Sequence, residues 1–142
     1  LVFTGSCCKY IEPWIREFAP TSNIKVMGWV ESTEQFFDSV SCVCVPSVTE
    51  GFGLLTLEAM ARGKVPVVSI GAGSEMVVEP YVNGLKIKPR DPVAIMDALT
   101  RMKDMDNVSF VTMMKNALLT AQEYSWENIR ERYKQAYREI ME

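Results

Sequence analysis

The stretch that decides the fold is "PSVTEGFGLLTLEAMARGKVPVVS", residues 46–69. It follows "CVCVP" at 42–46, which is apolar throughout and predicts a buried strand. A glycine corner then leads into a helix near 53–62, with Gly63 as its left-handed C-terminal cap. "VPVVSI" at 65–70 predicts the next strand, and Pro66 is tolerated at its start. Two continuous apolar strands joined by a helix predict a parallel pair.

The same alternation of strands and helices continues on both sides of this stretch. Upstream, the pattern predicts strands at 1–5 and 24–28, a helix near 9–19, and a short helix capped by Ser32 or Thr33. Downstream, it predicts a glycine turn at 71–80, a tight turn at Asn83-Gly84, a strand at 85–89, a helix opened by Asp91-Pro92, and helices near 108–123 and 126–141. The sequence therefore predicts an α/β fold: one domain, residues 1–142, with a Rossmann-like, doubly wound parallel sheet and C-terminal helices.

Composition excludes several classes of protein. The 142 residues carry 15 basic and 18 acidic side chains, a net charge of −3, so a nucleic-acid partner is not expected. No apolar run approaches the roughly 20 residues that span a bilayer. The sequence contains no histidine, which rules out a histidine base or a histidine-ligated metal within these residues.

The four cysteines, Cys7, Cys8, Cys42 and Cys44, do not have the spacing of a metal site, and none is expected. Cys42 and Cys44 alternate with valines, as small buried residues on a strand do. We therefore expect reduced thiols and a reducing, cytoplasmic compartment.

In doubly wound sheets, ligands bind beyond the carboxyl ends of the strands. Those ends fall here at Thr4–Cys8, Gly28–Glu31, Ser47–Gly53 and Ser69–Ser74, and each of them contains glycine. The pattern alone therefore predicts a cleft lined by these four segments.

The corner "SVTEGFGL" at 47–54 has the features of a phosphate site. Gly51 and Gly53 let the backbone approach a ligand closely, and the helix that follows presents free amide groups at its positive end. Glu50 and Glu58 would repel a phosphate, but carboxylates accept hydrogen bonds from sugar hydroxyls well. The combination leads to the hypothesis that the ligand is a nucleotide sugar.

Other interpretations of the two glutamates stay open from the residues alone. Glu50 is equally compatible with a surface loop and Glu58 with a solvated helix position. A glycosidase-type carboxylate pair is a further alternative. Glu75, after the glycine turn, either holds that loop or reaches a ligand.

Three segments together resemble a known family. They are "PSVTEGFGLLTLEAMARGKVPVVSIGAGSEMVVEPYVNGLKIKPRDP" at 46–92, "VMGWV" at 26–30 and "EYSWENIRERYKQAY" at 123–137. They resemble the donor-binding, C-terminal domain of retaining GT-B glycosyltransferases, in particular the GT4-like group.

The resemblance implies roles for individual residues. The residue that matches Glu50 is catalytic and contacts hydroxyls of the donor hexose, and the one that matches Glu58 holds the ribose hydroxyls. The implied donor-binding positions are Gly51, Phe52, Gly53, Leu54 and Leu55 around the diphosphate and sugar, Gly28, Trp29 and Val30 near the base, and Gly5 at the cleft wall.

The resemblance also implies the reaction. A hexosyl group would pass from a UDP-, GDP- or ADP-hexose to an acceptor, with retention at the anomeric carbon and no metal or other cofactor. The acceptor, whether a glycan, a lipid or a small molecule, is unknown. A non-catalytic nucleotide-binding module and a GT-B-type sugar-nucleotide epimerase remain alternatives.

The family pattern includes an Arg and a Lys, aimed at the diphosphate, on a β-α unit that would precede residue 1. We therefore expect this chain to lack that unit and the N-terminal acceptor domain, and to be inactive by itself. Peripheral attachment at the cytoplasmic face of a membrane would then run through that other half.

The last predicted helix carries one apolar stripe: Trp126, Ile129, Tyr133, Tyr137 and Ile140. In GT-B enzymes the last helix commonly crosses to the other domain. The alternative is that it packs on its own domain. If it crosses, an exposed apolar surface is expected on this chain.

Overall fold

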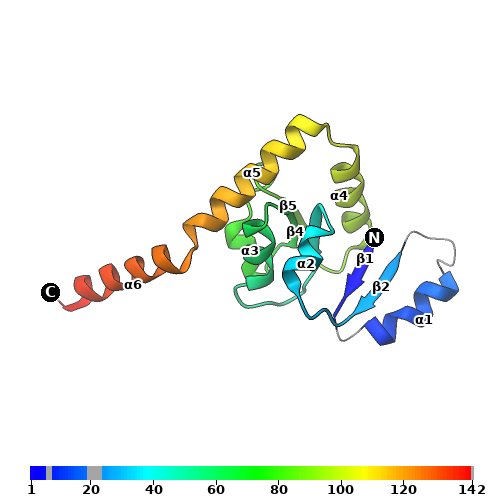
Figure 1. Ribbon diagram of the computed structural model, residues 1–142, viewed down its shortest axis with the longest axis horizontal. Helices are drawn as coiled ribbons and strands as arrows, with labels where there is room; N and C mark the ends of the chain where they lie inside the picture. Colours follow the sequence, from blue (N-terminus) through cyan, green and yellow to red (C-terminus); the bar gives the residue numbers. More distant parts are fainter. Residues whose placement is uncertain (6–7, 19–23, 142) are drawn as a thin grey trace. The chain divides into compact units, whose positions relative to one another are not determined.

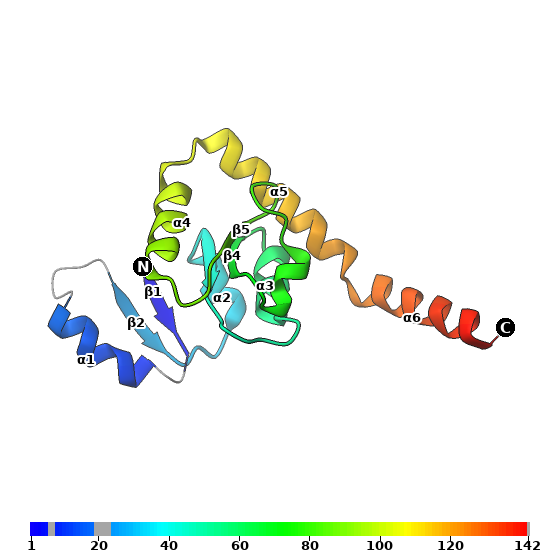
Figure 2. The same cartoon turned by 180° about the vertical axis from the view of Figure 1, so that it is seen from behind.

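The computed structural model describes residues 1–5, 8–18 and 24–141, with the side chains of Cys8 and Phe18 left out. The chain divides into two compact units, Leu1–Ser39 and Val40–Glu142. Figures 1 and 2 show the elements of each unit from opposite sides. Cys7 lies outside the described residues.

The first unit is a small parallel β-α-β arrangement. Strands β1 (Val2–Thr4) and β2 (Lys25–Gly28) pair in parallel, helix α1 (Cys8–Phe18) lies between them in sequence, and the short helix α2 (Thr33–Asp38) follows. The Ser32 hydroxyl accepts a hydrogen bond from the Gln35 amide at 3.3 Å, which confirms the predicted cap of α2. No residue of either strand is buried, so this pair contributes little to a core.

The second unit contains a three-stranded parallel sheet of β3 (Cys42–Val45), β4 (Val65–Ser69) and β5 (Leu85–Ile87), with β4 in the centre. All five residues of β4 are buried. The predicted fold class is confirmed, although the hydrogen-bonded strands form two sheets, one in each unit, instead of a single sheet.

Both faces of β4 are covered, as continuous apolar strands require. Val65 and Val67 pack with Ala98 and Met102 of α4 (Pro92–Asp104) and with Met113 of α5 (Asn107–Glu123). On the opposite face, Val68 belongs to a second cluster that draws on α3 (Leu54–Ala61), the 3-10 helix η1 (Gly73–Val77) and α5, with the members Met60, Val77, Val78, Ala117 and Ala121.

Pro66 occupies the second position of this central strand, where a missing N–H group normally weakens a sheet. The N–H group of Val65 donates a hydrogen bond to the carbonyl of Ser41, on the side of β3. The backbone N–H and C=O groups of successive residues in a strand point to opposite neighbouring strands, so those of position 66 point toward β5. Pairing with β5 begins only at Leu85, opposite Val67, and the proline therefore interrupts no ladder.

The predicted helix ends are also present. Gly63 has φ +66°. Its N–H group donates a hydrogen bond to the Met60 carbonyl at 2.8 Å, and the N–H group of Lys64 donates one to the Ala59 carbonyl at 2.9 Å. This pair of hydrogen bonds is a Schellman motif. The Asp91 carboxylate accepts hydrogen bonds from the amides of Val93 and Ala94, both at 3.1 Å, at the start of α4.

Helix α6 (Trp126–Met141) continues from the end of α5 and extends away from the sheet (Figures 1 and 2). None of its residues is buried, and its apolar stripe is exposed, from Trp126 at 81% to Ile140 at 79%, except for the half-buried Ile129. The described helices include none whose length and apolar content would suit a membrane crossing.

The loop between η1 and β5 is fastened by one buried asparagine. The Asn83 side chain accepts a hydrogen bond from the Glu79 amide at 2.7 Å and donates to the Val77 carbonyl at 3.0 Å and the Thr120 hydroxyl at 2.9 Å. Asn83 therefore braces the strand connection with two hydrogen bonds and ties it to α5 with a third.

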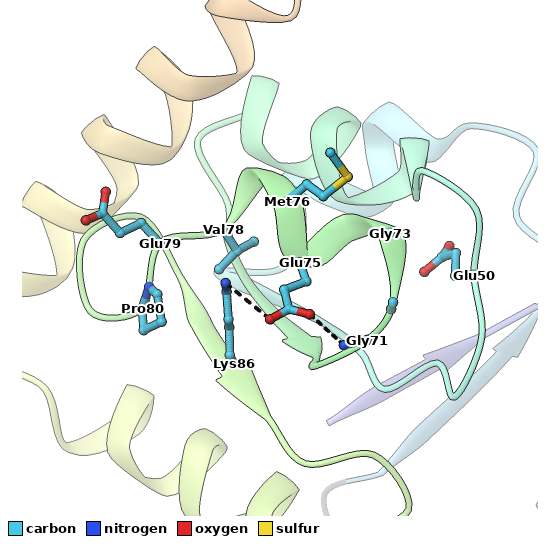
Figure 3. A pocket seen from close by; sticks show the side chains of 10 residues that line it. Glu50, Gly71, Gly73, Glu75, Met76, Val78, Glu79, Pro80 and Lys86 are labelled. Carbon is cyan, nitrogen blue, oxygen red and sulfur yellow. Dashed lines mark hydrogen bonds and ion pairs between the residues drawn. The ribbon is translucent and has the colours of Figure 1, made fainter.

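The loop after β4 is fastened by Glu75. Its carboxylate accepts a hydrogen bond from the Gly71 amide at 2.6 Å, and it lies 3.5 Å from the ammonium group of Lys86 on β5 (Figure 3). The hydrogen bond from Gly71, and then the positive charge of Lys86, hold the pKa of Glu75 below its ordinary value. These contacts support the first of the two roles left open for Glu75, that it holds the loop.

We predict that Asn83→Ala lowers the free energy of unfolding by about 1–3 kcal/mol, because it leaves buried backbone groups unpaired. Urea denaturation of the variant and the wild type measures the loss, provided that both unfold with the same m value. Asn116→Ala is the matched control, because it removes a single hydrogen bond to the Val82 carbonyl. A smaller loss for Asn83→Ala than for the control would contradict the prediction.

We predict that Glu75→Gln destabilises the second unit at neutral pH but progressively less in acid. A carboxylate whose folded pKa is lowered adds stability above its unfolded pKa and loses it as the pH falls through the folded value. Unfolding of the wild type and the variant between pH 7 and pH 3 measures the difference. Glu79→Gln is the control, because it removes the same charge without losing the contacts to Gly71 and Lys86. A difference in stability between Glu75→Gln and the wild type that does not change with pH would refute the role given to Glu75.

Candidate functional site

The corner after β3 requires glycine at its last position. Gly53 is the N-cap of α3 and has φ +77°, a left-handed conformation that disfavours other residues. A Cβ atom at Gly53 would also lie only 2.7 Å from the Cβ atom of Ser74. The helix therefore begins where the backbone can turn and where no side chain fits.

The corner after β3 and the glycine turn after β4 touch through their backbones. A Cβ atom at Gly73 would fall 1.3 Å from the carbonyl oxygen of Gly51, so only glycine is compatible with this approach. The Gly73 amide donates a hydrogen bond to the Glu50 carbonyl at 3.2 Å. Within the second unit, the two predicted strand-end segments therefore form one continuous surface.

The N-terminus of α3 has no side-chain cap. By contrast, Asp91 and Asp106 cap α4 and α5, each accepting hydrogen bonds from two amides. An uncapped N-terminus leaves amide groups and the positive end of the helix dipole available to an anion. Three of the predicted donor-binding residues lie here with exposed side chains, namely Phe52, Leu54 and Leu55.

A hollow of about 660 Å³ opens beside the two glycine loops (Figure 3). Its charged lining consists of Glu50, Glu75, Glu79 and Lys86, and its remaining lining residues are Gly71, Ala72, Gly73, Met76, Val78 and Pro80. Three carboxylates against one ammonium group make this hollow rich in hydrogen-bond acceptors. Such a lining suits hydroxyl groups better than a bare anion.

Lys86 was not among the residues predicted from the sequence. It is the middle residue of β5, between the buried Leu85 and Ile87, and it points to the other side of the strand. The alternation of "LKI" at 85–87 is the signal that would have found it.

Glu58 lies apart from Glu50. It is exposed on α3 and lines a second hollow of about 740 Å³ between α3, α5 and α6. Phe52 and Tyr124 contact each other there, with ring centroids 5.8 Å apart. The structure therefore brings Glu50 to the glycine loops and Glu58 to a separate, mainly aromatic and aliphatic surface.

The remaining predicted residues belong to the first unit. The carbonyl of Gly28 accepts hydrogen bonds from the Gly5 amide at 2.7 Å and the Thr4 hydroxyl at 2.9 Å, so the structure brings the two strand ends together. Trp29 is 78% exposed and Val30 is half-buried. Both glycines have positive φ angles, +116° for Gly5 and +69° for Gly28.

The described residues contain no group of three or more metal-binding side chains. Cys42 and Cys44 are free and half-buried on β3. Burial, and then the neighbouring Cys42, raise the pKa of the Cys44 thiol to about 11, so it stays protonated and unreactive at neutral pH.

Three comparisons place the chain among known proteins. Over 143 residues it is 29% identical to an uncharacterized glycosyltransferase of Methanocaldococcus jannaschii, covering 98% of this chain and 36% of the relative. A sucrose-phosphate synthase from Thermosynechococcus elongatus superposes with a TM-score of 0.81 at 29% identity, over 94% of this chain and 34% of the synthase. An Anabaena protein crystallised with UDP-glucose superposes with a TM-score of 0.83 at 20% identity, over 97% of this chain and 40% of that protein.

The chain thus spans little more than a third of the length of these relatives. The model of the family described as glycosyl transferases group 1 matches residues 1–104. The chain belongs to the group 1 glycosyltransferase family and has the fold of the C-terminal domain of GT-B glycosyltransferases.

Proposed function

We propose that this chain is the donor-binding part of a retaining glycosyltransferase, which binds a nucleoside-diphosphate sugar and transfers its hexosyl group. The proposal depends chiefly on one observation. The N-terminus of α3, in the glycine corner, carries no side-chain cap, and it lies beside an acceptor-rich hollow that Glu50 lines. The family to which the chain belongs supports it.

The two parts of this surface suit the two parts of a nucleotide sugar. The amides at Gly53–Leu55 and the helix dipole attract the diphosphate, and the dipole alone is worth about 0.3–1 kcal/mol at an exposed helix end. Glu50 then accepts hydrogen bonds from hydroxyls of the hexose. Glu58, on the exposed side of α3, accepts them from the ribose.

The uncapped helix also stabilises charge that develops during transfer. As the bond to the anomeric carbon breaks, negative charge accumulates on the departing diphosphate. Backbone amides that are already oriented toward that charge lower the barrier without reorganising. We also propose that Gly28, Trp29 and Val30 contact the nucleotide base and that Gly5 lines the cleft wall.

The identity of the donor is part of the proposal. The Anabaena protein with the same fold was crystallised with UDP-glucose, which makes a uridine donor the first to test. GDP- and ADP-hexoses are the alternatives. We further propose that the chain acts together with an acceptor-binding domain, since the relatives are much longer than this chain. We also propose that it acts in the cytoplasm.

We predict that Glu50→Ala and Glu58→Ala act differently in the full-length protein. Glu58→Ala weakens binding of UDP and UDP-glucose alike, because both contain the ribose. Glu50→Ala spares UDP and weakens UDP-glucose by roughly 10- to 100-fold, as expected from one lost hydrogen bond to a charged acceptor. Calorimetric titration with both ligands measures the two effects.

Glu123→Ala is the matched control, since it removes an exposed carboxylate at the end of α5. The roles assigned to the two glutamates would be wrong if both variants lost affinity for UDP and UDP-glucose in the same proportion. Failure of the wild-type protein to bind UDP-, GDP- and ADP-glucose would refute the proposed function itself.

A further inference from the structure

We propose that Ser74 is a positioning residue for Glu50: its hydroxyl donates a hydrogen bond to Oε2 of the Glu50 carboxylate and turns Oε1 toward the hollow. This inference rests on the proposed function, because it concerns how the carboxylate that contacts the hexose is oriented. Ser74 lies in η1, after the glycine turn that follows β4.

Two buried polar atoms without partners motivate the inference. Oε2 of Glu50 is inaccessible to solvent and has no hydrogen-bond partner among the described residues, and the same is true of the Ser74 hydroxyl. The Ser74 side chain is fully buried, at 0% exposure. A carboxylate oxygen buried without a donor is costly, whereas a hydroxyl can rotate to supply the missing proton.

The two side chains lie against the same point of the backbone. A Cβ atom at Gly53 would be 2.7 Å from the Cβ atom of Ser74 and 3.4 Å from both Cδ and Oε2 of Glu50. Both side chains therefore border the space that a side chain at Gly53 would need. Rotation of Ser74 between its staggered rotamers moves the hydroxyl relative to Oε2 without moving the backbone.

The backbone on both sides of Ser74 is anchored. The amide of Gly73, which precedes Ser74, donates its hydrogen bond to the carbonyl of Glu50 itself. The ion pair of Glu75, which follows Ser74, fastens the same loop to β5. Ser74 is thus held between two anchored residues, on the loop that contacts Glu50.

A division of labour between the two carboxylate oxygens follows. Glu50 lines the hollow while its Oε2 atom is buried, so Oε1 is the oxygen available to a ligand. A hydrogen bond at Oε2 restricts rotation of the carboxylate and holds Oε1 in one direction before the sugar arrives. Preorganisation of this kind favours the ligand group that Oε1 contacts and leaves the rest of the ligand unaffected.

The buried hydroxyls of Thr56 and Ser69 also have no partner among the described residues. Neither is among the atoms nearest to the Gly53 position, where Ser74 and Glu50 meet. Ser69→Ala therefore serves as a control that removes a buried, unpaired hydroxyl from the end of β4.

The binding test uses the full-length protein and a double-mutant cycle with UDP and UDP-glucose as probes. We expect Ser74→Ala to weaken UDP-glucose by about tenfold and to leave UDP binding unchanged, while Ser69→Ala changes neither. In a Glu50→Ala background, Ser74→Ala should have no further effect. Equal losses for UDP and UDP-glucose, or full additivity with Glu50→Ala, would overturn the inference.

A crystal structure of the wild-type protein tests the contact without reference to function. A separation of 2.5–3.0 Å between Oγ of Ser74 and Oε2 of Glu50 would support it. A separation beyond about 3.5 Å, or a water molecule paired with Oε2 in place of Ser74, would refute it. This second measurement tests the Ser74 assignment by itself. Failure of the proposed function would be seen separately, as absence of nucleotide-sugar binding by the wild type.

Discussion

The candidate site depends on the contact between the Gly51 carbonyl and Gly73, at which two loops meet without any side chain between them. One loop leaves β3 and starts α3, and the other leaves β4 and starts η1. Because these strands are parallel neighbours, both loops emerge at the same edge of the sheet. Close approach of their backbones then brings Glu50, the uncapped start of α3 and the Glu75–Lys86 pair into one region.

That region separates two electrostatic tasks. Phosphate groups are bound by the free amides at a helix N-terminus, which are available at α3 because no side chain caps it. Sugar hydroxyls are best bound by carboxylates, which outnumber cations in the neighbouring hollow. A capping aspartate such as Asp91 or Asp106 at this corner would occupy the amides and repel the diphosphate. The missing cap of α3 is therefore consistent with a binding role.

Most of the fold could be predicted from the sequence because its signals are local. Continuous apolar runs predicted β3 and β4, and single residues such as Ser32, Gly63 and Asp91 predicted helix ends through hydrogen bonds to near neighbours. What could not be predicted depends on contacts between distant segments. The approach of Gly73 to Gly51 and the place of Lys86 in the hollow are of this kind, and so is the separation of Glu50 and Glu58 into two hollows. The division of the strands into two sheets also has no local signal, since β1 and β2 differ from the others mainly in burial.

Pro66 has a consequence for how the sheet assembles. A shift of β5 toward the start of β4 would place one of its carbonyls opposite a residue that has no proton to donate, and it would exchange the two faces of the strand. Gly84 lies against the Pro66 carbonyl and ring, where a Cβ atom would not fit. The same shift would bring Leu85 into that position, and its side chain would clash with Pro66. Pro66, in the fully buried strand β4, therefore disfavours this shifted alignment of β5.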